Sequence, residues 1–327
     1  AMITLIVYFV DYGDTLTILV VFLCSLGLFF QVMDGFKYWF QSKLMSKYAA
    51  IATTAAYIIS SCYKIILLIT GKSVLWFALA TTVDYLAAAI ILYACYRKNK
   101  GPKLRLSTKK AKELLKSSYH YILSGLMIAI YGATDKLMLK YFLDEAAVGY
   151  YGIALNICNV WVFVLSAIID SMNPVIMESN NTDRVKYEKT NRLLYAMVFY
   201  ISVSVSVCIC VFAKFGVNLL YGEKYLPAVL PLRIATWYVA FSFLGVARNA
   251  WVVCENKQKY LTPLYAGSAL LNVVLNSILI PKSGAEGAAL ATLITQVGTI
   301  FLFPVFIKDM RPNVKMMVEG IGLRKLR

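Results

Sequence analysis

Long apolar runs separated by short polar connections fill most of the chain. Nine of these runs have about the length, roughly 20 residues, that an α-helix needs to cross a lipid core about 30 Å thick. The pattern therefore predicts an all-α polytopic membrane protein. We expect spans at residues 15–36, 46–69, 74–96, 118–142, 147–172, 193–214, 229–253, 260–281 and 284–307.

The composition agrees with this pattern. Of 327 residues, 60% are hydrophobic and 15% are charged, and the mean hydropathy is +0.67, so a water-soluble globule would have nowhere to bury its apolar surface. A tenth run, residues 2–10, is too short to span and lacks the regions of a signal peptide. We interpret it as the tail of a helix whose beginning is absent, and we expect further sequence upstream.

The net charge of +16 is unevenly distributed along the chain, because alternate connections are basic. The positive-inside rule predicts that these basic connections are cytoplasmic, and the C-terminus with them. The cations of these connections are Lys37, Lys43, Lys47; Arg97, Lys98, Lys100, Lys103, Arg105, Lys109, Lys110, Lys112, Lys116; Arg184, Lys186, Lys189, Arg192; Lys257, Lys259; Lys308, Arg311, Lys315, Arg324, Lys325 and Arg327.

The most basic connection, residues 97–117, carries nine Lys and Arg residues and no aromatic residue between them. Nucleic-acid binding is therefore disfavoured, and membrane lipids are the expected partner. We interpret this connection as a cytoplasmic linker between two helical lobes. The predicted organisation is an N-lobe remnant at 1–96, a C-lobe at 118–310 and a basic cytoplasmic tail at 311–327.

Several charged residues lie within the predicted spans, where each costs roughly 2.5–3.5 kcal/mol near the helix centre. Asp135 lies about 25 Å from the cytoplasmic end of its span, in the outer half of the bilayer. Lys136 and Lys140 share one face of that helix, and either lysine could instead extend to the outer headgroups. Asp170 is near a cytoplasmic helix end, where capping or solvation explains it.

Two arginines and an aromatic residue share one face of the span at 229–253. Arg233, Trp237, Leu244 and Arg248 fall within about 60° of one another at 100° per residue. This stripe predicts the wall of a protein-lined cavity. The alternative is that the arginines anchor the two ends of the helix at opposite membrane surfaces.

Asp84 lies near the middle of its span without a partner on the same helix. We expect it to be buried against Lys64 of the preceding antiparallel helix. The alternative is a carboxylate that couples transport to protons or sodium ions.

Cysteine and histidine chemistry is not indicated. The seven cysteines lie in or at the ends of apolar runs and form no CxxC pair, and the lone His120 has no carboxylate at a useful spacing. We therefore expect no metal, no catalytic triad and no cofactor.

Residues 271–292 combine two amides with a segment almost free of bulky side chains. Asn272 and Asn276 lie one turn apart and are expected to hydrogen-bond across to a neighbouring helix, for about 1 kcal/mol or less per bond. Pro281 is expected to end the helix, and residues 282–285 are expected to form the tight turn after it. The small residues after it predict close helix packing, and they are Gly284, Gly287, Ala288, Ala291 and Thr292.

Four segments resemble polysaccharide and O-antigen (Wzx-type) flippases of the multidrug/oligosaccharidyl-lipid/polysaccharide exporter superfamily. They are "WFQSKLMSKYAAI" (39–51), "ATDKLMLKYFLDEAAVGYYGIA" (133–154), "LLYGEKYLPAVLPLRIA" (219–235) and residues 271–292. One departure is Ser42, where the family more commonly has glycine. The resemblance implies a two-lobe helical bundle of twelve helices, of which the first two and most of the third are missing here.

The same resemblance implies a function. A flippase would move an undecaprenyl-pyrophosphate-linked oligosaccharide across the bacterial cytoplasmic membrane by alternating access, for O-antigen, capsule or exopolysaccharide synthesis. A polysaccharide polymerase and a chain-length regulator would be its partners. The cations expected to line a substrate cavity are Arg233, Arg248, Lys64 and Lys136, and the candidate carboxylates for H⁺ or Na⁺ coupling are Asp135 and Asp84.

Other functions remain open. A drug exporter of the same superfamily should favour an acidic cavity, and a lipid II flippase is often expected to have helices beyond the twelfth. A membrane-embedded polysaccharide enzyme should carry a sizeable exofacial loop with clustered carboxylates or arginines, which the short connections here disfavour. The last alternative is a scaffold that descends from a flippase but does not transport.

Overall fold

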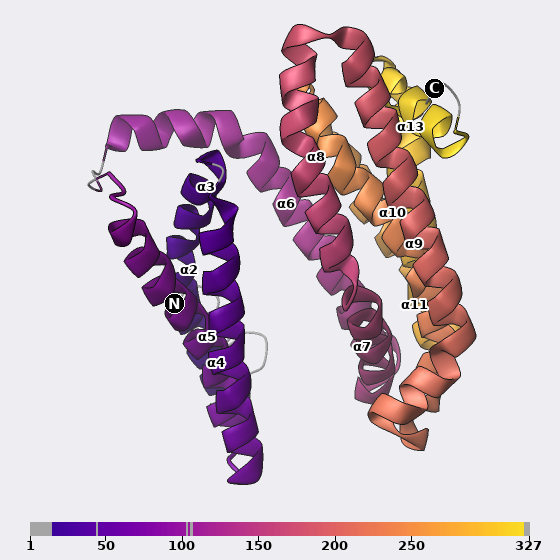
Figure 1. The fold of residues 1–327 in the computed structure, drawn as a ribbon. Helices are drawn as coiled ribbons and strands as arrows, with labels where there is room; N and C mark the ends of the chain where they lie inside the picture. Colours follow the sequence, from indigo (N-terminus) through magenta and orange to yellow (C-terminus); the bar gives the residue numbers. More distant parts are fainter. Residues whose placement is uncertain (1–14, 44, 103, 105–106, 324–327) are drawn as a thin grey trace. The chain divides into compact units, whose positions relative to one another are not determined.

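The computed structural model describes residues 15–43, 45–102, 104 and 107–323, and the elements within these ranges are all helical. The chain forms two units, residues 1–106 and 107–327 (Figure 1). The division falls within the connection expected to join two lobes. Helix begins again inside that connection, at Thr108, so its basic residues from Lys109 onward are helical.

Three long helices make up the first unit. Its elements are α2 (Thr15–Gln31), η1 (Val32–Asp34), α3 (Gly35–Ser42), α4 (Ser46–Ile69) and α5 (Val74–Lys98). The Thr82 hydroxyl of α5 donates to the Leu23 carbonyl of α2 over 2.8 Å, which fixes these two helices against each other. The short run predicted at residues 2–10 lies outside the described residues.

The second unit is a bundle around α10, whose side chains are the most completely enclosed. Trp251 of α10 lies in one core cluster with Tyr187 of α9 and Met317 of α13, and Leu232 of α10 lies in another with Leu139 of α6. The elements are α6 (Thr108–Phe142), α7 (Glu145–Asn159), α8 (Val162–Thr182), α9 (Arg184–Tyr221), η2 (Glu223–Ala228), α10 (Val229–Cys254), η3 (Gln258–Tyr260), α11 (Leu261–Val297), η4 (Gly298–Leu302), α12 (Phe303–Phe306), η5 (Lys308–Met310) and α13 (Arg311–Ile321).

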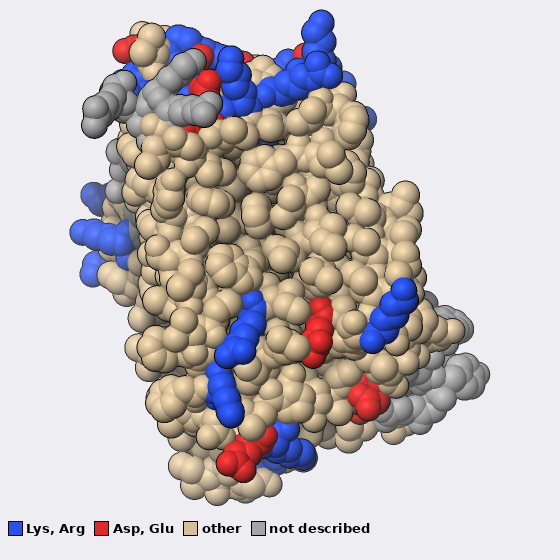
Figure 2. Space-filling model, turned by 90° about the vertical axis from the view of Figure 1, so that its right-hand side faces the viewer, with Lys and Arg blue, Asp and Glu red and all other residues tan. Residues whose placement is uncertain are grey.

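Eight helices of the described residues are long and apolar enough to cross a membrane. The prediction of a polytopic membrane protein is confirmed, but the bounds of some predicted spans differ from those of the helices. The span expected at 147–172 is divided between α7 and α8, and the spans expected at 260–281 and 284–307 share one element, α11, which is broken at Gly284. The face in Figure 2 shows a broad band without Lys, Arg, Asp or Glu across its centre, between charged residues above and below.

The chain reverses within α11 at Gly284. This residue has φ +56° and ψ −133°, a backbone conformation that favours glycine because a Cβ would clash. The break at Gly284 falls inside the turn expected at residues 282–285, and the first helix continues a short way past Pro281 before it ends. After the turn the chain packs tightly on itself, since a Cβ on Gly287 would lie 2.2 Å from the Leu279 carbonyl oxygen.

The segment expected to be a basic tail contains a docked helix, α13. Val314, Met316 and Met317 of α13 are buried against the bundle, and a Cβ on Gly320 would lie 2.5 Å from the Arg192 carbonyl oxygen of α9. The Asn313 amide donates to the Tyr195 hydroxyl over 2.7 Å. The tail prediction missed this helix because its apolar side is short and lies among basic residues.

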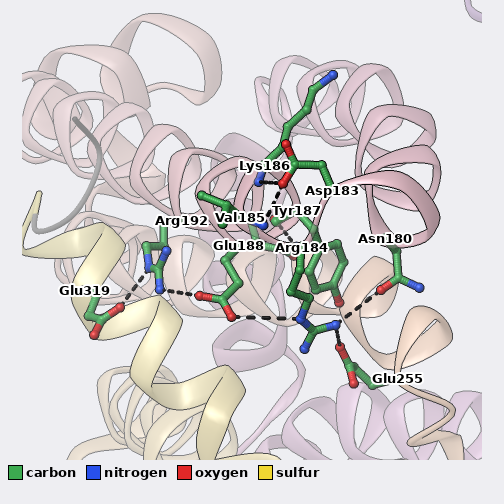
Figure 3. Close-up of polar contacts among 11 residues, drawn as sticks. Asn180, Asp183, Arg184, Val185, Lys186, Tyr187, Glu188, Arg192, Glu255 and Glu319 are labelled. Carbon is green, nitrogen blue, oxygen red and sulfur yellow. Dashed lines mark hydrogen bonds and ion pairs between the residues drawn. The ribbon is translucent and has the colours of Figure 1, made fainter.

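An ion-pair network holds α13 and the start of α9 to the neighbouring helix ends (Figure 3). Asp183 caps α9 by accepting from the Val185 and Lys186 amides. Arg192 Nε pairs with Glu319 of α13 at 2.8 Å, and Arg192 Nη2 pairs with Glu188 at 2.8 Å. The network also ties α10 to α9, since Arg184 pairs with Glu255 at 2.6 Å.

We expect Glu319→Gln to loosen α13. The Arg192 and Glu319 side chains are 11% and 12% exposed, so their pair should contribute about 1–3 kcal/mol, between an exposed and a fully buried ion pair. Thermal unfolding of the purified protein should show a lower midpoint. Lys315→Gln, which changes an exposed residue of the same helix, is the control; equal midpoints for both variants and the parent would contradict this role.

Candidate functional site

A buried carboxylate lies in the membrane-spanning part of the second unit. Asp135 of α6 is 3% exposed and accepts three hydrogen bonds from neutral side chains. The Tyr151 hydroxyl donates to Oδ2 over 2.7 Å, the Thr292 hydroxyl donates to Oδ2 over 2.6 Å, and Asn276 Nδ2 donates to Oδ1 over 2.6 Å. Asn276 Nδ2 also reaches Asn272 Oδ1 at 3.0 Å, which joins a fifth residue to the site.

Three helices bring these five residues together. Asp135 comes from α6, Tyr151 from α7, and the two asparagines from the first half of α11. Thr292 comes from the second half of α11, after the reversal at Gly284. The close approach at Gly287 therefore has a consequence for the site, because it lets the returning half of α11 present Thr292 to the same carboxylate as Asn276.

The site has no cation to balance Asp135. The ion pairs of the described residues do not include this carboxylate, and all three of its donors are neutral. Burying an ionised carboxylate without an opposite charge is costly in a medium of low dielectric constant. An ionised Asp135 would therefore need a bound cation, whereas a protonated Asp135 would be neutral.

Two polar atoms of the same site lack partners. Asn276 Oδ1 and Asn272 Nδ2 are buried without a hydrogen-bond partner. Most buried side-chain polar atoms in proteins are bonded, so such an exception asks for an explanation. The Asp135 carboxylate and the Thr292 hydroxyl supply oxygen atoms of the kind that hard cations bind, and the carboxylate can also bind a proton.

The predicted position of Asp135 agrees with the helix bounds. Asp135 lies seven residues before the end of α6 at Phe142, and Thr292 lies eight residues after Gly284. Both are therefore about 10–12 Å from the same end of the bundle at 1.5 Å per residue. The charge pattern of the loops predicts that this end is exofacial.

Two of the cations expected to line one cavity, Arg233 and Arg248, lie far apart on α10. Arg248 is fully buried, whereas Arg233 and Lys136 are exposed, and Lys64 belongs to the other unit. Arg233 and Arg248 are separated by about 22 Å along α10, because they are 15 positions apart. The expected stripe is thus divided: Leu244 and Arg248 pack inside the bundle, and Arg233 Nε donates outward to the Cys210 carbonyl over 3.1 Å.

Arg248 occupies an unusual environment. Its Nη1 donates to the Thr299 carbonyl over 3.4 Å, while Nε and Nη2 are buried without partners.

Lys140, which could extend to the outer headgroups, lies 3.4 Å from Glu145, and both side chains are well exposed.

The expected pair between Lys64 and Asp84 is wrong. Lys64 is exposed, Asp84 is half-buried, and the ion pairs of the described residues include neither. The packing register explains the failure: Ser60 of α4 bonds the Ala80 carbonyl of α5, and Tyr63 bonds the Trp76 carbonyl. Lys64 therefore lies about 12 Å along the helix axis from the level of Asp84.

The sequence suggested parts of this site separately. Asp135 was a candidate carboxylate, and the expected cross-helix bond of Asn276 is confirmed by its contact with Asp135. Tyr151 and Thr292 were missed as partners, because the pattern did not single out Tyr151 and assigned Thr292 to helix packing. The only sign in the sequence that these two residues belong to the site was that both are polar and lie near small residues at helical spacing.

The structure of this chain is similar to solved transporters. It resembles a structure titled lipid II flippase MurJ, inward closed conformation, with a TM-score of 0.72 at 14% identity over 98% of this chain and 72% of that one. It also resembles an outward-facing multidrug resistance MATE family transporter of the MOP superfamily, with a TM-score of 0.62 at 15% identity over 91% of this chain and 78% of that one. At these identities the likeness shows a shared fold.

Sequence comparison gives relatives with related names. The lipid II flippase MurJ of Bacillus subtilis is 27% identical over 77% of this chain and 51% of its own length. The probable low-salt glycan biosynthesis flippase Agl15 of Haloferax volcanii is 22% identical over 66% of this chain and 46% of its own. The chain thus spans about half the length of these curated relatives. Residues 4–230 match the model described as "Polysaccharide biosynthesis protein", and the chain belongs to this family.

Proposed function

We propose that the full-length protein is a flippase that moves a lipid-linked oligosaccharide from the inner to the outer leaflet, coupled to a cation gradient. The observation that carries the proposal is the buried Asp135 site, an unbalanced carboxylate among neutral oxygen-bearing side chains in a chain of this family. Intramembrane carboxylates of this kind mark ion or proton pathways in transporters.

The proposed substrate is an undecaprenyl-pyrophosphate-linked repeat unit for O-antigen, capsule or exopolysaccharide. The family description and the name of the archaeal relative, a probable glycan biosynthesis flippase, support a glycan substrate. The pyrophosphate needs cationic partners in place of water. Arg233 and Lys136, both exposed on the second unit, remain the proposed cations there, and Lys64 remains the proposed cation of the first unit.

Coupling would act through occupancy of the Asp135 site. Binding of H⁺ or Na⁺ neutralises the carboxylate and changes the hydrogen bonds that join α6 to both halves of α11. A ligand shifts a conformational equilibrium only if it binds the two states differently, and these bonds depend on how α6 and α11 pack. Asp84, half-buried in the first unit, remains a weaker candidate for the same role.

Lipid II is the alternative substrate. It is favoured by one observation, the likeness to MurJ both in sequence, at 27% identity, and in fold, at a TM-score of 0.72. Both substrates share the undecaprenyl-pyrophosphate group and differ in the sugars and peptide attached to it.

The charge pattern of the loops supports a proposed cellular location for the protein. The protein would lie in a bacterial cytoplasmic membrane with its basic loops and C-terminus on the cytoplasmic side. A polysaccharide polymerase and a chain-length regulator would use the flipped unit. The reaction would be transport, without a catalysed covalent step.

The test of the proposed function is complementation by the full-length gene. We expect it to restore surface polysaccharide in a host that lacks its O-antigen flippase, and to fail in a host depleted of its lipid II flippase. Rescue of the second host alone would replace the glycan substrate with lipid II. Rescue of neither host, with the protein present in the membrane, would contradict the proposed function.

Arg233→Ala should weaken this rescue while the protein remains folded. The side chain is exposed, and its one hydrogen bond goes to the Cys210 carbonyl, so its removal should affect stability by less than about 1 kcal/mol. The amount of surface polysaccharide at native expression is the measurement. Lys214→Ala, which removes an exposed cation of α9, is the control, and wild-type rescue by Arg233→Ala would contradict a contact with pyrophosphate.

A further inference from the structure

A second polar feature of the bundle is separate from the Asp135 site. A cavity of about 150 Å³ opens between α6, α10, the first half of α11 and η4. Its floor is formed by buried residues that include Gly245, Ser268 and Thr299, and its mouth by exposed residues that include Val246 and Asn249. None of its lining residues belongs to the Asp135 site.

The cavity is polar but uncharged. Six of its ten lining residues carry a hydroxyl or an amide, and none carries a charge. Polar side chains inside spans need a reason, because lipid offers them no partner. The six are Ser242, Asn249, Tyr265, Ser268, Gln296 and Thr299.

Local structure keeps this space open. Gly245 leaves room on α10, since a Cβ there would lie 3.1 Å from Ile300 Cδ1 and 3.9 Å from the Tyr265 hydroxyl. The opposite wall is the π-helix η4, a distortion often found at functional sites. On the side of this wall away from the cavity, Arg248 Nη1 donates to the Thr299 carbonyl. The Thr299 hydroxyl lies 2.6 Å from the Ser268 hydroxyl on the cavity floor.

The size and chemistry of the cavity fit a sugar ring. Its volume equals that of about five waters at roughly 30 Å³ each, so together with its open mouth it can take up one face of a sugar ring. Ile128, Val246 and Ile300 offer apolar contact to the C–H faces of such a ring, and the hydroxyls and amides offer hydrogen bonds. Without a Lys, Arg or carboxylate in the lining, an anion or a cation would find no charged partner.

The position fits an early stage of transport. Asn249 lies five residues before the end of α10 at Cys254, about 8 Å along the helix. With the basic loops cytoplasmic, this places the mouth of the cavity in the inner half of the membrane. A lipid-linked glycan made in the cytoplasm would meet this depth first.

We infer that this cavity binds one neutral sugar residue of the lipid-linked substrate and so contributes to glycan selectivity. The inference rests on the proposed function. It assigns the sugar to residues of α10, α11 and η4, apart from the cations proposed for the pyrophosphate and from the Asp135 site.

The test compares two ligands on the purified full-length protein. One is a short-chain prenyl pyrophosphate carrying a single N-acetylglucosamine, and the other is the same prenyl pyrophosphate without the sugar. Asn249→Leu removes an exposed amide at the mouth, and Ser242→Val removes a hydroxyl of the lining. Ser277→Val is the control, because that exposed hydroxyl of α11 bonds only its own helix at the Val273 carbonyl.

Each cavity variant should bind the sugar-bearing ligand about tenfold more weakly, the effect of losing one well-placed hydrogen bond, and the bare ligand as before. The control should bind both ligands normally. Unchanged affinity for the sugar-bearing ligand, or an equal loss for both ligands, would overturn the inference while leaving the flippase proposal standing. Failure of the parent protein to bind either ligand, together with failed complementation, would overturn both.

Discussion

Replacing Asp135 with Asn is expected to abolish transport while leaving the protein folded. Asparagine has nearly the same size, and its carbonyl oxygen can still accept from Thr292 and Tyr151. It cannot carry the negative charge that a bound cation would balance. We expect a loss of at least about tenfold in complementation or transport rate, in keeping with the importance of intramembrane carboxylates.

The matched control is Asp144→Asn. Asp144 lies at the same end of the bundle and caps α7 by accepting from the Ala147 amide over 2.8 Å, a role that asparagine fills equally well. Transport by Asp144→Asn should therefore match the parent. Wild-type transport by Asp135→Asn would show that the buried carboxylate is only structural.

Gly287→Val is expected to prevent stable folding of the second unit. A Cβ at this position would lie 2.2 Å from the Leu279 carbonyl oxygen and 2.5 Å from its carbon, and both are backbone atoms that cannot rotate away. The two halves of α11 would have to separate, and Thr292 would leave Asp135. Overpacking of this kind costs about 1–3 kcal/mol or more, so little protein should reach the membrane in folded form.

Gly149→Ala is the comparison for that variant. It also adds a side chain to a helical glycine, but nothing lies within 4 Å of the added carbon, and alanine favours the helix. Its membrane level and thermal midpoint should equal or exceed those of the parent. Normal levels of Gly287→Val would mean that the close approach within α11 is not required.

The helical architecture could be predicted because the membrane limits the choices. In a lipid bilayer, backbone groups must hydrogen-bond within their own segment, so an apolar run of spanning length forms a helix. The spans could therefore be located from the apolar runs alone. The small residues from Gly284 to Thr292 predicted close packing, and the tight contact of Gly287 with Leu279 agrees with it. The turn expected at residues 282–285 contains the observed break, although the sequence did not single out Gly284, whose backbone conformation favours glycine.

The composition of the site could not be predicted, because helical periodicity gives the face of a residue and leaves the register between helices open. Asp135 is 141 residues from Asn276 and 157 from Thr292 along the chain. The same limitation produced the wrong pair of Lys64 with Asp84, which lie on adjacent helices at different levels. It also explains Arg233 and Arg248, which share a helical face but differ in burial.

The docked helix α13 was missed for another reason. Its buried residues, Val314, Met316 and Met317, form too short a pattern to stand out beside the surrounding cations. Its placement depends on partners in α9, namely the Arg192 carbonyl at Gly320 and the Arg192 guanidinium at Glu319.

The most direct test of the account is transport by the purified full-length protein in proteoliposomes that carry a lipid-linked oligosaccharide. The measured quantity is the rate at which the oligosaccharide becomes accessible to an added glycosidase or lectin on the opposite side, with and without an imposed sodium or proton gradient. We expect the parent protein to transport the oligosaccharide, and one of the two gradients to accelerate this transport. Asp135→Asn should abolish it. Absence of transport by the parent protein, or equal rates for the parent and Asp135→Asn under every gradient, would contradict the account.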